Sequence, residues 1–142
     1  LDRVHAEAER RGLRIECHQA DANALDPFEP GAFDLVSAQY ASIPRTPDDR
    51  GVRNVINAVA PGGTLLVVSH DLEPMRAPID TLAHSRPFDP DAYVTVDDFA
   101  AALAQTSAWD IEVHEKRPRP PGAATAAIHA DDIVLRARHR AS

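Results

Sequence analysis

Two strand-like segments joined by a helix-like segment constrain the fold of this 142-residue chain more than any other feature. The strand-like segments are 33–40 and 61–70, and in the second one 64–69 reads as an apolar run without polar alternation. Between them, Thr46 can cap a helix, Pro47 suits its first position, and an apolar face follows at helical spacing. A strand, helix, strand order predicts a right-handed parallel crossover, the basic unit of a doubly wound α/β fold.

The rest of the chain adds weaker elements around this unit. The run 64–69 is typical of a strand covered on both faces, so we expect it to be central in the sheet. A capping box formed by Thr95 and Asp98 predicts the start of a later helix. The other predicted elements are a helix over 1–11 ended by Gly12, a one-sided strand over 13–17, a long excursion over 71–93 with one short helix, and two antiparallel strands at 109–113 and 133–137.

Composition limits the classes of function. A formal net charge of −7 argues against a nucleic-acid partner, because phosphate binding needs a concentrated positive field. No apolar run is long enough to span a bilayer, and the single cysteine, Cys17, cannot form an intramolecular disulfide. The histidines and Cys17 match no usual metal-ligand spacing. We therefore expect a cytoplasmic protein with one domain, no metal, and neither membrane nor nucleic acid as a partner.

The ordered set of segments resembles a family of enzymes. The strand after Pro61-Gly62-Gly63 ends in His70-Asp71, and the closing run 129–138 is rich in acidic and aliphatic residues. In local sequence and in the order of its elements, the whole chain, residues 1–142, resembles the C-terminal part of a single class I S-adenosylmethionine-dependent methyltransferase domain. The closest type is that of small bacterial tellurite-resistance and thiopurine methyltransferase-like enzymes. The resemblance implies a Rossmann-like sheet, mainly parallel, with an antiparallel C-terminal pair of strands.

The resemblance also implies the positions of the cofactor site. In the family, an acid just past the third strand accepts a hydrogen bond from the adenine amine, and the next backbone N–H reaches the ring, so Asp21 and Ala22 would face adenine. Residues at the end of the following strand would border the methionine part of S-adenosylmethionine and the substrate. These residues are Ser37, Ala38, Gln39 and Tyr40, and the Tyr40 ring would cover the sulfonium. The alternatives are an aspartate that closes a turn and an ordinary half-buried tyrosine.

His70 is the candidate catalytic residue. It ends the strand-like segment 61–70, and it would remove a proton from a hydroxyl, amine or thiol of a small-molecule acceptor as the methyl group moves. Many methyl transfers need only positioning, so the alternative is a loop histidine that hydrogen-bonds to Asp71.

The chain departs from the family in one respect. The first two strands of the family, with the glycine-rich turn and the acid that holds ribose, would precede Leu1, and they would lie between 13–17 and 33–38 in the family order 3-2-1-4-5-7-6. Without them, 13–17 has no neighbour. An upstream segment could complete the sheet, a second copy could form a homodimer that supplies or swaps strands, or 13–17 could pair directly with 33–38. We favour the upstream segment.

Two functions of different class follow from this pattern. One is methyl transfer from S-adenosylmethionine to a small molecule by the complete protein, with the excursion over 71–93 as a substrate lid. The other is a truncated, cofactor-deficient interaction or oligomerisation module.

Overall fold

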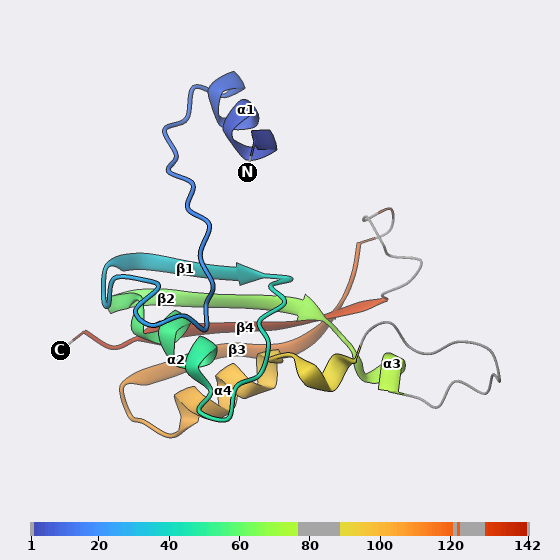
Figure 1. The fold of residues 1–142 in the computed structure, drawn as a ribbon. Coiled ribbons are helices and arrows are strands. Elements are labelled where there is room, and N and C mark those ends of the chain that lie inside the picture. The colour runs from blue at the N-terminus through green and yellow to red at the C-terminus, as the bar shows by residue number, and fades with distance from the viewer. Residues whose placement is uncertain (1, 77–88, 121, 123–129, 142) are drawn as a thin grey trace.

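One mixed sheet of four strands forms the centre of the molecule in the computed structural model, which describes residues 2–76, 89–120, 122 and 130–141 (Figure 1). The strands are β1 (Phe33–Gln39), β2 (Val59–His70), β3 (Trp109–Pro118) and β4 (Asp131–His139), in the order β1-β2-β4-β3. β1 and β2 are parallel, and β4 is antiparallel to both of its neighbours. The predicted parallel crossover and the predicted antiparallel final pair are confirmed. The described sheet is mixed, however, and not mainly parallel.

Helices cover one face of this sheet. Figure 1 shows α2 (Arg50–Asn57) and α4 (Val96–Ala104) packed along the same side of the strands. The capping box at α4 is confirmed, because the Thr95 side chain accepts from the backbone N–H of Asp98 and the Asp98 side chain accepts from that of Thr95. The excursion after β2 contains α3 (Glu73–Arg76) and a 3₁₀ turn at Pro90–Ala92. Much of the predicted lid, 77–88, lies outside the described residues.

Helix α2 begins later than the sequence predicts. Thr46 does not cap it in the usual way, and Pro47 is not its first residue, because the first helical residue is Arg50. The Thr46 hydroxyl accepts from the Arg50 backbone N–H at 3.0 Å, and the Thr46 carbonyl accepts from the Asp49 N–H at 3.1 Å. Thr46 therefore closes a turn that precedes the helix, and Asp49 enters α2 with a left-handed φ of 50°.

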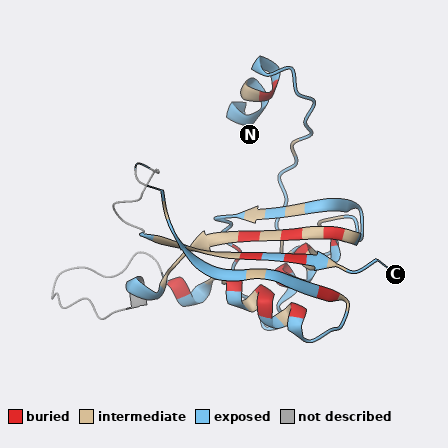
Figure 2. Ribbon diagram, turned by 180° about the vertical axis from the view of Figure 1, so that it is seen from behind, coloured by how far each residue is buried: buried red, intermediate tan, exposed pale blue. Residues whose placement is uncertain are grey.

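The core lies between β2, β4 and the two helices. Leu65, Leu135 and Leu103 are almost completely buried, and Figure 2 shows buried residues along these elements. In β2, Leu65 and Val67 are buried, whereas the intervening Leu66 and Val68 are only half-buried. The prediction that this strand is central is confirmed. The prediction that it is covered on both faces is wrong for the described residues, because the helices cover only one side.

Residues 13–17 do not form a strand, contrary to the prediction. They belong to an extended arm, 13–19, that joins the sheet region to α1 (Asp2–Arg10), which lies away from the sheet (Figure 1). Gly12 ends α1 with φ 64°, as predicted from its position. Leu13 and Ile15 remain exposed. A strand is stabilised by hydrogen bonds to a neighbour, and the arm has no such neighbour in the described part of the chain; it does not pair with β1.

Candidate functional site

The loop that carries Asp21 and Ala22 is fixed by hydrogen bonds from two asparagines. The Asp21 carboxylate accepts from the Asn23 backbone N–H at 2.8 Å, which closes a local turn. The Asn54 amide of α2 donates to the carbonyl oxygens of Ala22, at 2.8 Å, and Ala24, at 3.0 Å. Asn23 also donates through its side chain to the Pro44 carbonyl at 2.9 Å. These contacts hold the loop against α2 and against the segment that follows β1.

Gly51 allows this close approach. A Cβ atom at position 51 would lie 2.7 Å from Asn23 Oδ1 and 2.5 Å from Ile43 Cγ2. Both distances are shorter than normal van der Waals contact. The first turn of α2 therefore needs glycine, because the loop and the segment after β1 pack directly on its backbone.

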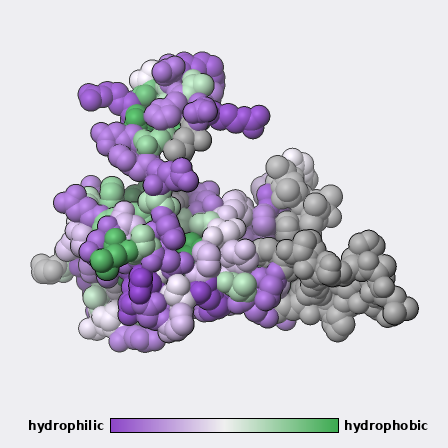
Figure 3. Space-filling view, in the orientation of Figure 1, coloured by the Kyte–Doolittle hydropathy of each residue, from purple (hydrophilic) through white to green (hydrophobic). Residues whose placement is uncertain are grey.

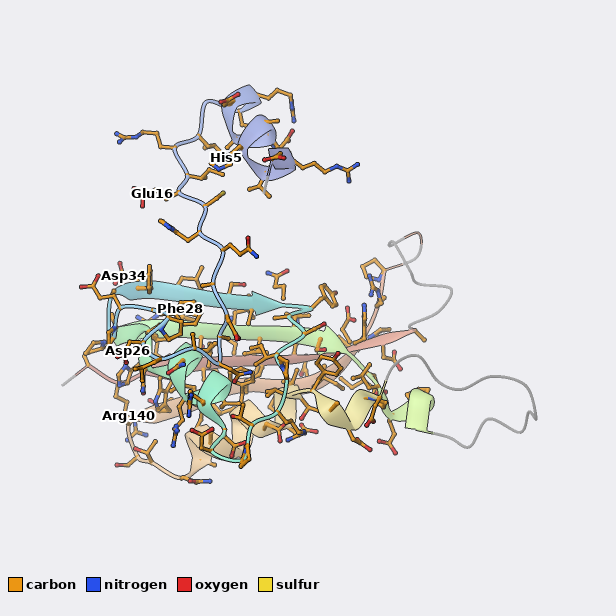
Figure 4. All side chains as sticks on the ribbon, viewed as in Figure 1. His5, Glu16, Asp26, Phe28, Asp34 and Arg140 are labelled. Atoms are coloured by element: carbon orange, nitrogen blue, oxygen red, sulfur yellow. The ribbon has the colours of Figure 1, made fainter. Side chains whose placement is uncertain are left out.

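A cavity of about 560 Å³ lies beside β1 and brings four of the predicted cofactor residues together. Asp21, Ala22, Ser37 and Ala38 all line it. Most of the remaining lining is apolar and comes from the loop before β1, from β1 itself and from α2, as with Phe28, Val36 and Val55. Figure 4 labels Phe28 next to the sheet, and Figure 3 shows hydrophobic atoms on the surface below the arm. Volume and lining suit a flat aromatic ring with a carboxylate at its edge.

Gln39 and Tyr40 are not among the residues that line this cavity. The Gln39 amide donates to the Ser37 hydroxyl at 3.1 Å, along the exposed side of β1. The Tyr40 backbone N–H continues the ladder to the Val68 carbonyl at 2.8 Å, but φ of Tyr40 is 53°. This left-handed backbone turns the chain out of the strand, so the Tyr40 side chain leaves the line of β1.

Tyr40 instead joins a polar cluster, which we call the edge cluster and which consists of Tyr40, His70, Arg119 and Asp132. It lies at the edge of the sheet where β1, β2 and β3 end and where β4 begins. His70 and Asp132 are opposite each other in the β2–β4 register. Each strand thus contributes one side chain at or next to the terminus that lies at this edge of the sheet. In open α/β sheets, this carboxyl edge is where ligands bind.

Asp132 is the acceptor at the centre of the edge cluster. Its Oδ2 accepts from the Tyr40 hydroxyl at 2.8 Å, and its Oδ1 lies 3.0 Å from His70 Nδ1. Arg119 Nη1 lies 3.6 Å from Asp132 Oδ1 and 2.9 Å from His70 Nδ1. The side chains of Asp132 and Arg119 are 13% and 9% exposed, so this ion pair is largely shielded from water.

Tyr40 acts as a hydrogen-bond donor in this arrangement. The bond to Asp132, together with burial and the negative charge of that carboxylate, raises the pKa of the Tyr40 hydroxyl, although Arg119 opposes the shift. The Tyr40 ring also contacts the His70 ring at a centroid distance of 4.5 Å, and the Arg119 guanidinium lies 5.6 Å from the Tyr40 ring centre. Tyr40 therefore stays protonated at neutral pH and braces the other three side chains.

A second cavity, of about 250 Å³, adjoins His70 on the side of α4. Ser69, His70, Asp71 and Thr95 line it, with Lys116 of β3. Lys116 Nζ lies 2.6 Å from Asp71 Oδ2, and this contact raises the pKa of the Lys116 ammonium. Asp71 therefore pairs with Lys116, whereas His70 contacts the carboxylate of Asp132. The described residues contain no group of three or more His, Cys, Asp or Glu side chains able to hold a metal ion. None of the described helices has the length and apolar character to cross a membrane.

Sequence reasoning missed Arg119 and Asp132 as site residues. Arg119 follows a strand of mixed polar and charged residues, and Asp132 lies near the start of the last strand described. Neither residue belongs to a local sequence motif that would mark it as a site residue. The predicted antiparallel pairing of the final two strands could have placed them near one another. Only the register of β2 against β4 places Asp132 opposite His70.

Comparisons with known proteins agree with this fold. Residues 1–67 match the sequence model of a methyltransferase domain family. No curated protein matched the chain. Among solved structures, the cyclase SpnF is 17% identical with a TM-score of 0.61, over 97% of this chain and 61% of that one. A protein from Pyrococcus horikoshii is 13% identical with a TM-score of 0.63, over 98% of this chain and 66% of that one.

A third neighbour is an S-adenosylmethionine-dependent methyltransferase from Mesorhizobium loti, 18% identical with a TM-score of 0.57, over 98% of this chain and 77% of that one. The chain spans about three fifths of the length of the first structures that it matches. Because one neighbour is a cyclase, the reaction has to be argued from the site and not from the fold alone. The family match covers just under half of the chain, and the solved structures, all at low sequence identity, show that the chain shares the fold of these proteins.

Proposed function

We propose that the complete protein transfers a methyl group from S-adenosylmethionine to a small-molecule acceptor. The observation that supports this most directly is the cavity beside β1, where Asp21, Ala22, Ser37 and Ala38 meet although two of them precede β1 and two belong to it. When bound, the cofactor supplies the methyl group from its sulfonium sulfur. We further propose that the protein is a cytoplasmic bacterial enzyme of the tellurite-resistance and thiopurine methyltransferase-like type.

The residues of the chain have distinct roles in this proposal. The Asp21 carboxylate accepts from the adenine amine, and the Ala22 backbone lies against the ring. Ser37, Ala38, Gln39 and Tyr40 follow in order toward the methionine end of the cofactor and toward the acceptor. His70 takes the proton of the acceptor, because an imidazole nitrogen that carries a lone pair can accept a proton. The outer edge of β1 is completed by an upstream segment of the protein, which supplies the contacts to ribose.

Calorimetry on the complete protein tests the cofactor site. S-adenosylmethionine and its demethylated product, S-adenosylhomocysteine, should both bind, and Asp21→Ala should weaken binding by about tenfold or more, since it removes a hydrogen bond to a charged acceptor. Asp34→Ala is the matched control. Asp34 lies near the start of β1 (Figure 4), whereas Ser37 and Ala38 lie near its end, so the Asp34→Ala variant should leave the affinity unchanged. The absence of binding of either compound to the complete protein would refute the proposal.

One observation favours the second candidate function, an interaction module. The outer edge of β1 has no neighbouring strand among the described residues, and Phe33 and Leu35 are 47% and 59% exposed. An open strand edge with apolar side chains can pair with another chain. A stable dimer in sedimentation analysis of a protein that binds neither form of the cofactor would support this function over methyl transfer.

A further inference from the structure

Two histidine–aspartate pairs among the described residues use different ring nitrogens. In the edge cluster, the contact to Asp132 is made by Nδ1 of His70 at 3.0 Å. At the start of α4, the contact to Asp97 is made by Nε2 of His114 at 2.8 Å. A neutral imidazole carries one proton, and a carboxylate can only accept, so each contact selects the nitrogen that carries the proton. The two pairs therefore select opposite tautomers.

At His70, two neighbours of Nδ1 favour different tautomers. Nδ1 lies 3.0 Å from Asp132 Oδ1 and 2.9 Å from Arg119 Nη1. A protonated Nδ1 donates to Asp132, whereas an unprotonated Nδ1 accepts from Arg119, and the nitrogen cannot do both at once. The second state would place an imidazole lone pair against a carboxylate oxygen. The tautomer of His70 therefore depends on which of these two neighbours determines the proton position.

The geometry favours Asp132. His70 and Asp132 face each other in the β2–β4 register, and the other oxygen of Asp132 is held by the Tyr40 hydroxyl, so the position of the carboxylate is fixed from two sides. Arg119 has five N–H donors and also lies 3.6 Å from Asp132 Oδ1, so it can donate to the carboxylate instead of the imidazole. All three neighbours of the carboxylate are satisfied only when Nδ1 carries the proton.

We propose that Asp132 is a positioning residue that holds His70 in the tautomer protonated at Nδ1, so that Nε2 is the nitrogen that takes the proton of the methyl acceptor. The base role rests on the proposed function, whereas the tautomer does not. In the transfer, the acceptor O–H, N–H or S–H bond breaks, the proton bonds to Nε2, and the electron pair that remains forms the bond to the methyl carbon, whose former bonding pair stays on the sulfur of the cofactor. The Asp132 carboxylate balances the charge of the imidazolium.

Nitrogen NMR on the ¹⁵N-labelled protein tests this directly. Long-range proton–nitrogen correlations, recorded above about pH 8.5 where ordinary imidazoles are neutral, distinguish the two tautomers of each histidine. We expect His70 to carry its proton on Nδ1 and His114 to carry its proton on Nε2 in the same spectrum. His70→Gln and His114→Gln identify the two signals. A His70 proton on Nε2 in the unmodified protein would overturn the proposal.

Two variants separate positioning from simple packing. Asp132→Ala should move the His70 proton to Nε2, because Arg119 then becomes the partner of Nδ1. Asp97→Ala is the matched control, and it should leave the His70 tautomer unchanged. If Asp132→Ala does not fold, Asp132→Asn should lower the fraction protonated at Nδ1, since an amide can also donate to that nitrogen. An unchanged His70 tautomer in the Asp132 variant would contradict the proposal. Neither cofactor nor acceptor is needed, so failure here is distinguishable from failure of methyl transfer.

Discussion

β1 and β2 are neighbours in one sheet, and both contain apolar residues, but they differ sharply in burial. Leu65 of β2 is completely buried, whereas Leu35 of β1 is 59% exposed, although the two strands pair directly. In the described part of the chain, β2 has a strand on both sides and helices on one face, while β1 has a strand on one side only. Apolar sequence therefore shows that a segment can join a core, but neighbours decide whether it does.

The largest contrast should appear in proteolysis. Arg14 lies in the exposed arm and Arg11 in the turn just before it, whereas Arg136 and Arg138 lie in β4 between two hydrogen-bonded neighbours. Trypsin cleaves extended, unpaired backbone, so in a brief digest of this chain the first cuts should follow Arg11 or Arg14. Mass spectrometry of the early fragments measures this. First cuts within β4 would show that the arm is better protected than its exposure indicates.

The same contrast should be large in stability. Leu65→Ala in β2 leaves a cavity in the core and should reduce the free energy of unfolding by about 2–5 kcal/mol. Leu35→Ala in β1 removes a side chain that is mostly in water, and the expected change is about 0.5 kcal/mol or less. Urea unfolding of both variants gives the comparison. Equal losses would mean that β1 is covered in solution.

The junction between the two strands should show an intermediate effect. A Cβ atom at Gly63 would lie 2.8 Å from the Ala60 carbonyl oxygen and 3.1 Å from the Asp34 carbonyl oxygen, both of which are backbone atoms. Gly63→Ala should therefore cost about 1–3 kcal/mol through overpacking. Leu35→Val, on the exposed side of β1, is the control and should change the unfolding free energy little. A neutral Gly63→Ala would indicate that β1 is loosely held at its start.

The smallest expected effect concerns a carboxylate on the packed side of the sheet. Burial alone would raise the pKa of Asp98, but hydrogen bonds from Arg45 and Thr95 outweigh it and hold the pKa below its ordinary value of 3.8. A lowered pKa in the folded state stabilises the fold above the unfolded value, and this contribution disappears as the pH falls through the folded value. The stability difference between the native protein and Asp98→Asn should therefore be present at pH 7 and shrink below about pH 3.8. A difference that is the same at both pH values would contradict this assignment.

Local sequence signals predicted a good part of this fold. The parallel crossover, the capping box at Thr95 and Asp98, the glycine end of α1 and the antiparallel final pair all depend on residues close together in the chain. The predictions were wrong where the structure of a segment depends on residues distant in the sequence. The apolar run in β2 does not reveal that the described helices cover only one face, and the alternating pattern of 13–17 does not reveal that none of the described strands lies beside it.

The candidate site divides in the same way. Asp21, Ala22, Ser37 and Ala38 were predicted from the resemblance to the methyltransferase family, and the structure brings them to one cavity. Tyr40 was predicted for its ring face, but the structure joins its hydroxyl to Asp132, more than ninety residues away in sequence. Asp132 could not be chosen from the sequence, because its role depends on the exact register between β2 and β4.

The position of β4 also determines the order in which this protein can be completed during synthesis. β4 follows β2 and β3 in the sequence, yet it lies between them in the sheet, so neither of these strands has β4 as its neighbour until β4 has been synthesised. β3 pairs with no other strand in the described sheet. In the nascent chain, the edges of β2 and β3 that face β4 therefore remain unpaired until β4 emerges, and only then can His70 and Asp132 meet.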